Sequence, residues 1–503
     1  MLSNPIGYID SFLNRITMYR LMLYYLIALI VSAGFFGIFS FLPYTLQDLL
    51  FSAVIAITVG YISNYFFSKI FKAQTNIESV FISSLILVLI MPVGFPKDSL
   101  LLALASVIAM ASKYILAFNK RHIFNPAAVS AVIMSFFGYT ASWWIGSLVM
   151  FPFIFSGGLL LLRKTQREKM TMVFITVFLS FSAIVTFFLT GSLETALTAW
   201  RISIFDSSML FFMFVMLIEP LTSPARKKPQ IYFAFLISFI YTATQTGIIN
   251  LAITPEITLL IGNIFAYLIY PNYRLILNLK DKLKLSKDTY SFIFEKQNNF
   301  NFIPGQYMEW TLAHKKADAR GNRRYFTISS SPTEESLAIT AKFYDPSSTY
   351  KEELLNFGNK KITASLVSGD FILPKNINLP IVFIAGGVGI TPFRSMIKYI
   401  VDKNLKSDII LIYLNKTEDE ILFQDIFKTA EKNGVKTKYF LTSKRGHLNE
   451  DEIKKLVPDF QKRIFYISGP QLMVRSFEKM LLNIRISKNK IKTDFFPGYA
   501  ETK

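Results

Sequence analysis

The sequence contains no cysteine and only three histidines, His122, His314 and His447, among its 503 residues. Without thiols the chain cannot form disulfides or ligate ordinary iron–sulfur clusters and thiolate-bound zinc. A membrane haem needs a pair of histidines within apolar segments, and only His122 lies near such a segment. These absences predict no haem, no iron–sulfur cluster and no bound metal. Any electron transfer would then rely on organic cofactors.

Acidic residues are also scarce, with 34 Asp and Glu against 54 Lys and Arg, which gives a formal net charge of +20. A strongly basic chain can bind nucleic acid, but no segment interleaves aromatic and basic residues as such modules do. In the first half, the Lys and Arg residues fall in alternate short loops between apolar runs, as the positive-inside rule requires. We therefore expect no nucleic-acid partner and place both termini in the cytoplasm.

Long apolar runs fill roughly the first 270 residues, each long enough to cross a hydrocarbon core of about 30 Å. The N-terminus shows no short apolar region followed by a small-residue cleavage site, so the first run is expected to stay on the chain. The sequence predicts a polytopic α-helical domain over residues 1–275, in contact with lipid in the plasma or inner membrane. Its about ten spans lie near residues 20–42, 48–70, 77–93, 98–118, 126–138, 142–162, 170–190, 207–220, 230–249 and 253–271.

Two residues of this domain are candidate functional groups. Asn125 precedes Pro126, a favourable cap and first residue for a helix over 126–138 that would cover only roughly 20 Å. Such a half-helix can point its backbone dipoles at a ligand, whereas a tilted ordinary helix is the alternative. Glu219 ends an apolar run before Pro220, and an ionisable group at membrane depth is a functional candidate. The alternative for Glu219 is an interfacial position beside a cytoplasmic loop.

The pattern changes after residue 275. Residues 276–288 read as a basic amphipathic connector at the membrane surface. Five segments with alternating apolar and polar residues then predict a small antiparallel β-barrel over 289–375. From 376 to 503, strands alternate with helices, which is typical of a doubly wound parallel sheet.

Four motifs in this second half indicate nucleotide chemistry. The first is the run IVFIAGGVGITPF, in which a strand leads into Gly386, Gly387 and Gly389. Glycines there let the backbone approach a pyrophosphate, and the following helix N-terminus favours its charge. The others are Arg324–Ser330, whose alternate side chains share one face of a strand, Ser468-Gly469-Pro470 at a strand end, and the C-terminal segment Asp494–Tyr499, whose aromatic residues can cover a flat cofactor. Taken singly, each motif also suits ordinary packing.

In this order and spacing, the four motifs resemble the ferredoxin–NADP reductase superfamily over roughly residues 286–500. The resemblance implies an FAD-binding barrel followed by an NAD(P)-binding domain, with NADH or NADPH as substrate. Thr327 and Ser468 would act at the reacting rings, Ser468 standing where the family usually has cysteine. The remaining FAD contacts would be Arg324, Phe326, Ser347, Ser348, Thr349 and Phe496, and the nucleotide contacts Gly386, Gly387, Gly389, Ile390, Thr391, Pro392, Gly469 and Pro470.

The choice between NADH and NADPH stays open. Ser443, Lys444 and Arg445 follow a predicted strand at the position where a 2′-phosphate would lie, and Arg matches phosphate geometry. A solvated basic loop is the alternative interpretation.

The membrane half carries a weaker resemblance. The segments Ile123–Ala128 and Ile218–Pro224 are similar to elements of the membrane subunits of the Na⁺-translocating NADH:quinone reductase and of Rnf complexes. That family carries FMN esterified to a threonine, but this chain offers only Thr140 in the corresponding region, without the family's loop. The resemblance therefore implies a noncovalent FMN or a quinone site rather than covalent FMN.

The leading hypothesis is a membrane-bound NAD(P)H-oxidising flavoprotein that passes electrons through FAD to a quinone or second flavin. Further electron-transport subunits are possible partners. A component of a redox-driven Na⁺ or H⁺ pump, or a flavin redox sensor coupled to a transporter-like domain, are the alternatives. A haem-containing ferric reductase is excluded because the membrane histidine pairs are missing.

Overall fold

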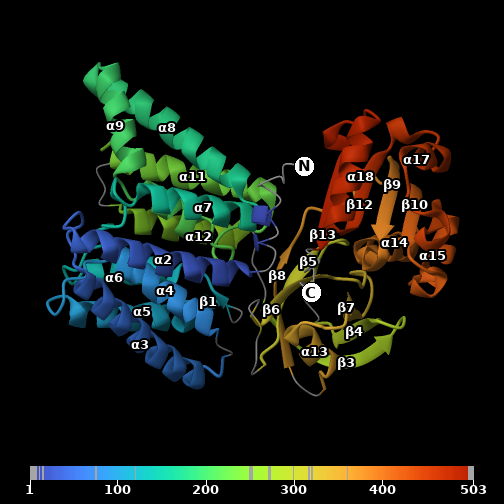
Figure 1. The fold of residues 1–503 in the computed structure, drawn as a ribbon, viewed down its shortest axis with the longest axis horizontal. Coiled ribbons are helices and arrows are strands. Elements are labelled where there is room, and N and C mark those ends of the chain that lie inside the picture. The colour runs from blue at the N-terminus through green and yellow to red at the C-terminus, as the bar shows by residue number, and fades with distance from the viewer. Residues whose placement is uncertain are drawn as a thin grey trace. The chain divides into compact units, whose positions relative to one another are not determined.

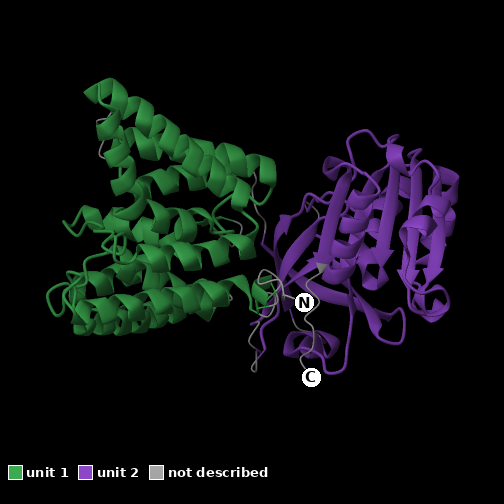
Figure 2. Cartoon of the chain, turned by 45° about the horizontal axis from the view of Figure 1, so that its top comes forward, with its two compact units in different colours: residues 1–273 green, residues 274–503 purple. Residues whose placement is uncertain are grey.

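The computed structural model describes residues 8–10, 12–13, 16–73, 76–118, 121–247, 253–269, 274–297, 300–314, 318, 321–358 and 361–496. Two compact units divide the chain, residues 1–273 and residues 274–503 (Figure 2). The boundary lies two residues before the predicted end of the membrane domain at residue 275.

Unit 1 is a helical bundle that also contains a short antiparallel strand pair (Figure 1). Its described elements are α2 (Met18–Ile38), α3 (Leu46–Ile70), α4 (Ile77–Ile90), α5 (Ser99–Ile115), β1 (Ala117–Phe118), β2 (Arg121–His122), α6 (Pro126–Ser135), α7 (Phe151–Thr165), α8 (Glu168–Thr190), α9 (Leu193–Phe205), α10 (Met209–Phe211), the π-helix η1 (Phe212–Leu217), α11 (Lys227–Gln245) and α12 (Pro255–Ile269).

Three of these helices, α2, α3 and α8, are long and apolar enough to cross a membrane. A fourth candidate is the pair formed by α9 and the 209–217 segment, which is bent by 55°. The prediction of about ten spans is therefore not confirmed, although a helix forms in each predicted segment. One predicted start was wrong, because α7 begins at Phe151 rather than at 142, and one helix, α9, was not predicted.

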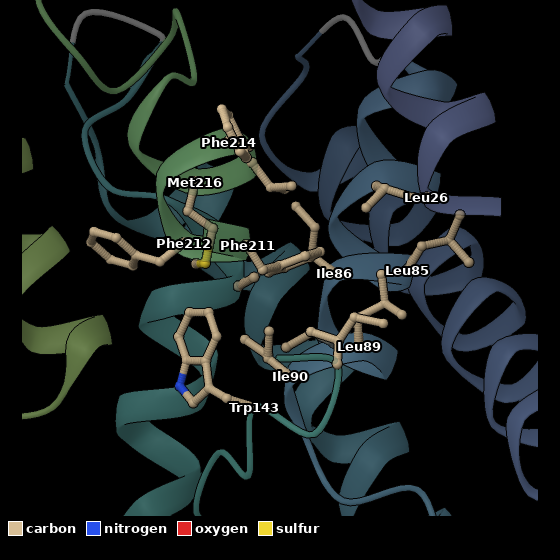
Figure 3. Close-up of a cluster of buried hydrophobic side chains, with 14 of the residues drawn as sticks. Leu26, Leu85, Ile86, Leu89, Ile90, Trp143, Phe211, Phe212, Phe214 and Met216 are labelled. Atoms are coloured by element: carbon tan, nitrogen blue, oxygen red, sulfur yellow. The ribbon is translucent and has the colours of Figure 1, made fainter. Parts of the chain in front are cut away.

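The core of unit 1 is aliphatic and aromatic. Every residue of α4 from Ser83 to Ile90 is buried, as is all of η1, so neither segment has a polar face. Such all-round burial is expected of a segment enclosed by other helices. Figure 3 shows Ile86 and Ile90 of α4 gathered with Phe211 and Trp143.

The first half of unit 2 is a six-stranded antiparallel sheet in the order β6-β5-β8-β3-β4-β7. Its two edge strands meet through a bridge between Ile328 and Ile339, which closes the sheet into a barrel. The strands are β3 (Arg274–Lys284), β4 (Thr289–Glu295), β5 (Tyr307–Thr311), β6 (Arg323–Thr327), β7 (Ser336–Lys342) and β8 (Lys361–Ser368), and the short helix α13 (Thr349–Leu355) lies between β7 and β8.

The prediction of a surface connector over residues 276–288 was wrong. Most of it belongs to β3, which pairs with β8 through residues 274–278 and with β4 through residues 279–284. Leu275 and Leu277 are buried on one face, while the lysine-rich end is mostly exposed. The basic alternation therefore reflects a half-exposed strand rather than a surface connector.

The second half is a five-stranded parallel sheet in the order β11-β10-β9-β12-β13, as predicted for a doubly wound fold. Apolar side chains of alternate parity form two separate cores, one on each face. The strands are β9 (Pro380–Gly386), β10 (Asp408–Asn415), β11 (Val435–Leu441), β12 (Ile464–Pro470) and β13 (Ile491–Phe496). The main helices are α14 (Thr391–Asp402), α15 (Gln424–Ala430), α17 (Glu450–Leu456) and α18 (Gln471–Asn483).

Candidate functional site

The glycine turn lies where the strand order of the parallel sheet reverses. β9 pairs with β10 on one side and with β12 on the other, so its carboxyl end is the switch point at which open α/β sheets bind ligands. A 3₁₀ turn over Gly387–Ile390 then leads into α14, whose first turn contains Thr391 and Pro392. The predicted strand–turn–helix arrangement is confirmed.

At two of the three positions glycine is required, and the steric reason differs between them. Gly387 has φ +52° and a Cβ there would meet no atom within 4 Å, so it needs glycine for its backbone and borders open space. A Cβ on Gly389 would lie 2.4 Å from the Ser468 carbonyl oxygen and 2.6 Å from Gly469 Cα. The turn is therefore packed directly against the end of β12, and the open side of Gly387 is where a phosphate can approach.

Ser468 contributes an unusual polar atom to this switch point. Its side chain is fully buried, and its Oγ has no hydrogen-bond partner among the residues that the structure describes. Buried hydroxyls are nearly always satisfied, so such a group is explained by a ligand or a water molecule. Ser468 faces Ala385 in register, next to the glycine turn. The predicted Ser468-Gly469-Pro470 edge and the glycine turn thus form one site.

The predicted FAD residues also come together. Arg324 on β6 is 8% exposed, and its guanidinium forms an ion pair with Asp318 at 3.2 Å. It lies 5.0 Å from the centre of the Tyr350 ring and donates to the Gly321 carbonyl at 3.0 Å. Asp318 therefore holds Nη2 of Arg324 while Nη1 bonds backbone carbonyls, and a guanidinium can also bind a phosphate through two parallel N–H groups.

The Ser-rich turn joins the same cluster through Asp318. The Asp318 amide donates to Thr349 Oγ1 at 3.0 Å, while Ser348 caps α13 by accepting from the Lys351 amide at 3.3 Å. Ser347 lies further out and donates to the Tyr344 carbonyl at 2.6 Å. Thr349 and Arg324 are thus brought together through Asp318, whereas Ser347 bonds the Tyr344 carbonyl.

Thr327 and Phe326 end β6 with different environments. Thr327 is buried at 4% exposure, whereas Phe326 is half-buried and its ring lies 6.0 Å from that of Tyr350. The chain after Thr327 runs directly against α14, where Ser395 Oγ donates to the Ser330 carbonyl at 2.6 Å. The loop after β6 and the helix after the glycine turn are therefore in contact within unit 2.

The basic loop and the C-terminal strand complete the carboxyl edge. Ser443 and Arg445 lie exposed just beyond β11, and the Arg445 guanidinium lies 5.5 Å from the Phe440 ring centre. Phe496 is the last residue of β13 and faces Pro470 in register, but its side chain lies outside the described residues. The same holds for residues 497–499 of the predicted aromatic segment.

Sequence reasoning missed two acidic residues of this site. Asp318 sits in a loop with no motif, so only the fold brings it to Arg324. Asp494 belongs to the predicted aromatic segment Asp494–Tyr499, but no role was predicted for its carboxylate. Its register with Ser468 depends on a parallel strand pairing that local sequence does not reveal. Although the residue keeps some exposed surface, burial raises the pKa of the Asp494 carboxyl to about 7.

The two candidates of unit 1 also meet. Asn125 caps α6 by accepting from the Ala128 amide at 3.1 Å, as predicted, and donates to Glu219 Oε2 at 2.8 Å. Thr222 Oγ1 donates to the same carboxylate oxygen at 3.0 Å, and Asn263 accepts from the Asn125 amide at 2.9 Å. A cavity of about 30 Å³ adjoins Asn125 and Glu219, which suits one or two water molecules rather than a ring system.

Comparison with known proteins supports the reading of unit 2. Residues 383–479 match the family described as "Oxidoreductase NAD-binding domain". A flavohemoprotein of Oceanobacillus iheyensis is 26% identical over 234 residues, covering 43% of this chain and 57% of that protein. A glycine betaine monooxygenase reductase subunit of Chromohalobacter salexigens is 26% identical over 208 residues, covering 38% of this chain and 55% of that protein. The chain thus spans little more than half the length of these curated relatives.

Among solved structures, the FAD/NAD-binding domain of a nitric oxide dioxygenase from Vibrio cholerae aligns with a TM-score of 0.38 at 20% identity, covering 44% of this chain and 98% of that one. The family match and the curated relatives support the resemblance predicted from the motifs for the second half. The C-terminal region of this chain thus carries an NAD-binding domain of the oxidoreductase type.

Proposed function

We propose that the chain is a membrane-bound NAD(P)H-oxidising flavoprotein that passes electrons to a quinone or a second flavin. The observation that carries the proposal is the switch point of the parallel sheet. There, Gly387 has an open side, and the buried Ser468 hydroxyl has no partner among the described residues. The loop that follows Thr327 is bonded to the helix that follows the glycine turn. Binding a reduced nicotinamide next to a flavin explains all three features.

Each residue then has a defined task. When bound, FAD supplies the chemistry by accepting a hydride from the nicotinamide and releasing electrons singly or in pairs. Gly387 admits the nucleotide pyrophosphate, and the Ser468 hydroxyl bonds the nicotinamide. Arg324 holds the FAD pyrophosphate, while the Thr327 hydroxyl bonds a ring nitrogen of the flavin. Arg445 would favour NADPH, because its fork matches a 2′-phosphate.

The membrane location rests on unit 1. Its three long apolar helices are compatible with membrane association, and the positive-inside pattern would expose unit 2 to the cytoplasmic nucleotide pool. We keep about ten spans and the likeness to the Rnf membrane subunit as part of this proposal, together with lipid contact and further electron-transport subunits.

The test uses the full-length protein purified in detergent. We expect a flavin absorbance spectrum, FAD released into the supernatant after acid precipitation, and anaerobic bleaching by NADH or NADPH. Flavin retained in the acid pellet would instead indicate covalent attachment, and Thr140 would be examined. A preparation that binds no flavin under any reconstitution would refute the proposal.

A redox-driven ion pump is the second candidate, and Glu219 is the observation that favours it. This carboxylate lies in an apolar helical unit within a network that includes the buried residues Asn125, Asn263 and Thr222. Ionisable groups in such places often mark ion or proton pathways. Proteoliposomes oxidising NADH would build a Na⁺ or H⁺ gradient if the candidate is right. Turnover without any gradient would leave only the reductase function.

A further inference from the structure

Helix α14 begins directly after the glycine turn, and its first turns pack against the loop that follows the barrel strand β6. The Arg394 guanidinium donates to the Glu334 carboxylate from both Nη1 and Nη2, and Nη2 lies 2.8 Å from Glu334 Oε1. The same guanidinium donates to the Ser329 carbonyl at 3.1 Å. Both side chains are largely buried, with exposures of 14% and 24%. A two-pronged Arg–carboxylate contact fixes orientation as well as distance.

The neighbouring residues strengthen this contact. Ser395, which is fully buried, donates to the Ser330 carbonyl at 2.6 Å. The Glu334 carboxylate also accepts from the Ser331 amide at 2.5 Å, so it holds its own loop in shape. We call this set, Arg394, Ser395, Ser329, Ser330 and Glu334, the Arg394 clamp.

The clamp joins the two halves of the proposed redox site, and its residues lie close in sequence to the predicted site residues of each half. Ser329 lies two residues after Thr327, which would contact the flavin ring. Arg394 lies three residues after Thr391, which opens the helix behind the glycine turn. Any rotation of the nucleotide domain against the barrel must stretch these bonds. The relative position of the two rings therefore depends on the clamp.

The location of the clamp argues against a general stabilising role. A second two-pronged pair, Arg463 with Asp408, has Nη2 distances of 3.0 and 3.1 Å and lies within the nucleotide domain at the amino ends of β9 and β10. It stabilises one domain without bridging to the barrel. Among the described residues of unit 2, these are two pairs of the same chemistry, and of the two the Arg394 pair joins the barrel to the nucleotide domain.

We propose that Arg394 is a positioning residue which, through Glu334 and Ser329, sets the distance of the nicotinamide from the flavin. The inference rests on the proposed function. The step served moves one hydride, a proton with two electrons, from C4 of the nicotinamide, which is oxidised, to the flavin, which is reduced. Because a misplacement of about 1 Å can cost up to about a hundredfold in rate, loosening the clamp should slow this step while leaving both binding affinities intact.

The experiment compares Arg394→Lys, Glu334→Gln and Ser395→Ala with the control Arg463→Lys in the full-length protein. Anaerobic stopped-flow reduction by NADH and NADPH gives the limiting rate of flavin reduction and the apparent Kd of the nucleotide. Arg394→Lys and Glu334→Gln should lower the limiting rate about tenfold or more, with Kd and FAD content within about twofold of wild type. Lysine cannot replace the fork. Ser395→Ala, which removes one bond, should show a smaller effect of the same kind.

A readout that needs no turnover accompanies the rates. Hydrogen exchange of residues 329–334, measured without nucleotide, should become faster in Arg394→Lys and Glu334→Gln but stay unchanged in Arg463→Lys. The control should lower the melting temperature without changing the limiting rate. If Arg394→Lys fails to fold, Glu334→Gln and Ser395→Ala decide the question.

Two negative results are distinguishable. Wild-type protein that holds FAD but is never reduced by either nucleotide would sink the proposed function itself. A wild-type protein that is reduced normally, with clamp variants reduced at the same limiting rate or slowed only as much as Arg463→Lys, would overturn the positioning role alone.

Discussion

Replacing Gly389 by alanine tests the packing of the turn against β12. The new Cβ would lie 2.4 Å from the Ser468 carbonyl oxygen and 2.6 Å from Gly469 Cα, and all three nearest atoms belong to the backbone. An ordinary contact needs about 1 Å more, so the turn and the end of β12 must move apart. Overpacking of this kind costs about 1–3 kcal/mol. The shift would also carry the Ser468 hydroxyl away from the turn, so the affinity for nucleotide should fall.

Gly387→Ala is the matched control, because its Cβ would meet nothing within 4 Å. Its cost is the left-handed backbone alone, about 1 kcal/mol. Yet the added methyl lies on the side where the pyrophosphate would approach, so nucleotide affinity should still fall. Urea unfolding followed by circular dichroism gives the free energies, and NAD(P)H titration of the flavin absorbance gives the apparent Kd.

The two variants must therefore separate stability from binding. Gly389→Ala should lower both the free energy of unfolding and the affinity for nucleotide, whereas Gly387→Ala should lower mainly the affinity. If Gly387→Ala binds NADH and NADPH as tightly as wild type, the open side of the turn is not the pyrophosphate site. If Gly389→Ala is as stable as wild type, the contact with β12 does not constrain the fold.

Four further changes have defined outcomes. Asp494→Asn should raise the free energy of unfolding at pH 8 by at most about 4 kcal/mol, because a folded-state pKa of about 7 makes the native carboxyl prefer its proton. The wild-type protein keeps its full free energy of unfolding below about pH 4, where Asp494 is protonated in both states, and loses part of it as the pH rises through about 7. The difference between variant and wild type should therefore vanish in acid. A difference that does not depend on pH would contradict the prediction. Ser468→Ala should leave the apo protein as stable as wild type or more so, by up to about 1–3 kcal/mol, while weakening nucleotide binding; a less stable apo protein would show that Oγ is satisfied. Arg324→Lys should lower the FAD content of purified protein, since lysine lacks the fork, and full FAD retention would remove Arg324 from the site. Asn125→Ala should cost about 1 kcal/mol for the lost cap and more for the Glu219 contact, which thermal unfolding in detergent would measure against wild type.

The strands of unit 2 were predictable where their pattern is local. Alternation of apolar and polar residues located β4 to β8, and apolar runs ending in glycine or polar residues located β9 to β12. β3 and β13 were missed because polar and charged residues interrupt their apolar pattern, and because part of β3 pairs with β8, which is remote in sequence. β3 joins β8 to β4, and its lysines give it the appearance of a surface segment. Pairing over such distances is a property of the whole sheet rather than of any short window.

The late start of α7 has a similar cause. Residues 142–150 are apolar enough to continue a helix, but the backbone amides of Ser142 and Trp143 donate to the Ile90 carbonyl at 2.8 and 2.9 Å. Trp143 also adopts φ +49° and donates its indole N–H to Glu256 at 2.6 Å. These tertiary bonds replace the helical ones. A hydropathy pattern contains no sign of them.

The site shows the same division between motif and fold. The glycine turn and the Ser468 edge could be found because a phosphate cradle needs glycines, and because ligands bind at the carboxyl ends of strands. The residues that connect the motifs, Asp318 and Glu334, have no signature. A carboxylate becomes part of such a site through its arginine partner, and the partner is chosen by the fold.

The paired state of Arg324 bears on how FAD would bind. Since Asp318 already bonds Nη2 of Arg324 and the Gly321 carbonyl accepts from Nη1, a pyrophosphate reaching that guanidinium would replace existing partners, and the displaced carboxylate must be rehydrated. The net electrostatic gain is then small. Most of the affinity would have to come from burying the flavin ring against apolar surface, for which the half-buried Phe326 is a candidate. Ser468 presents the opposite case, because its buried hydroxyl has no partner among the described residues and would gain a full hydrogen bond when its ligand arrives. The nucleotide edge thus draws more specificity from polar contacts than the flavin edge, which follows from the partners that each group already has.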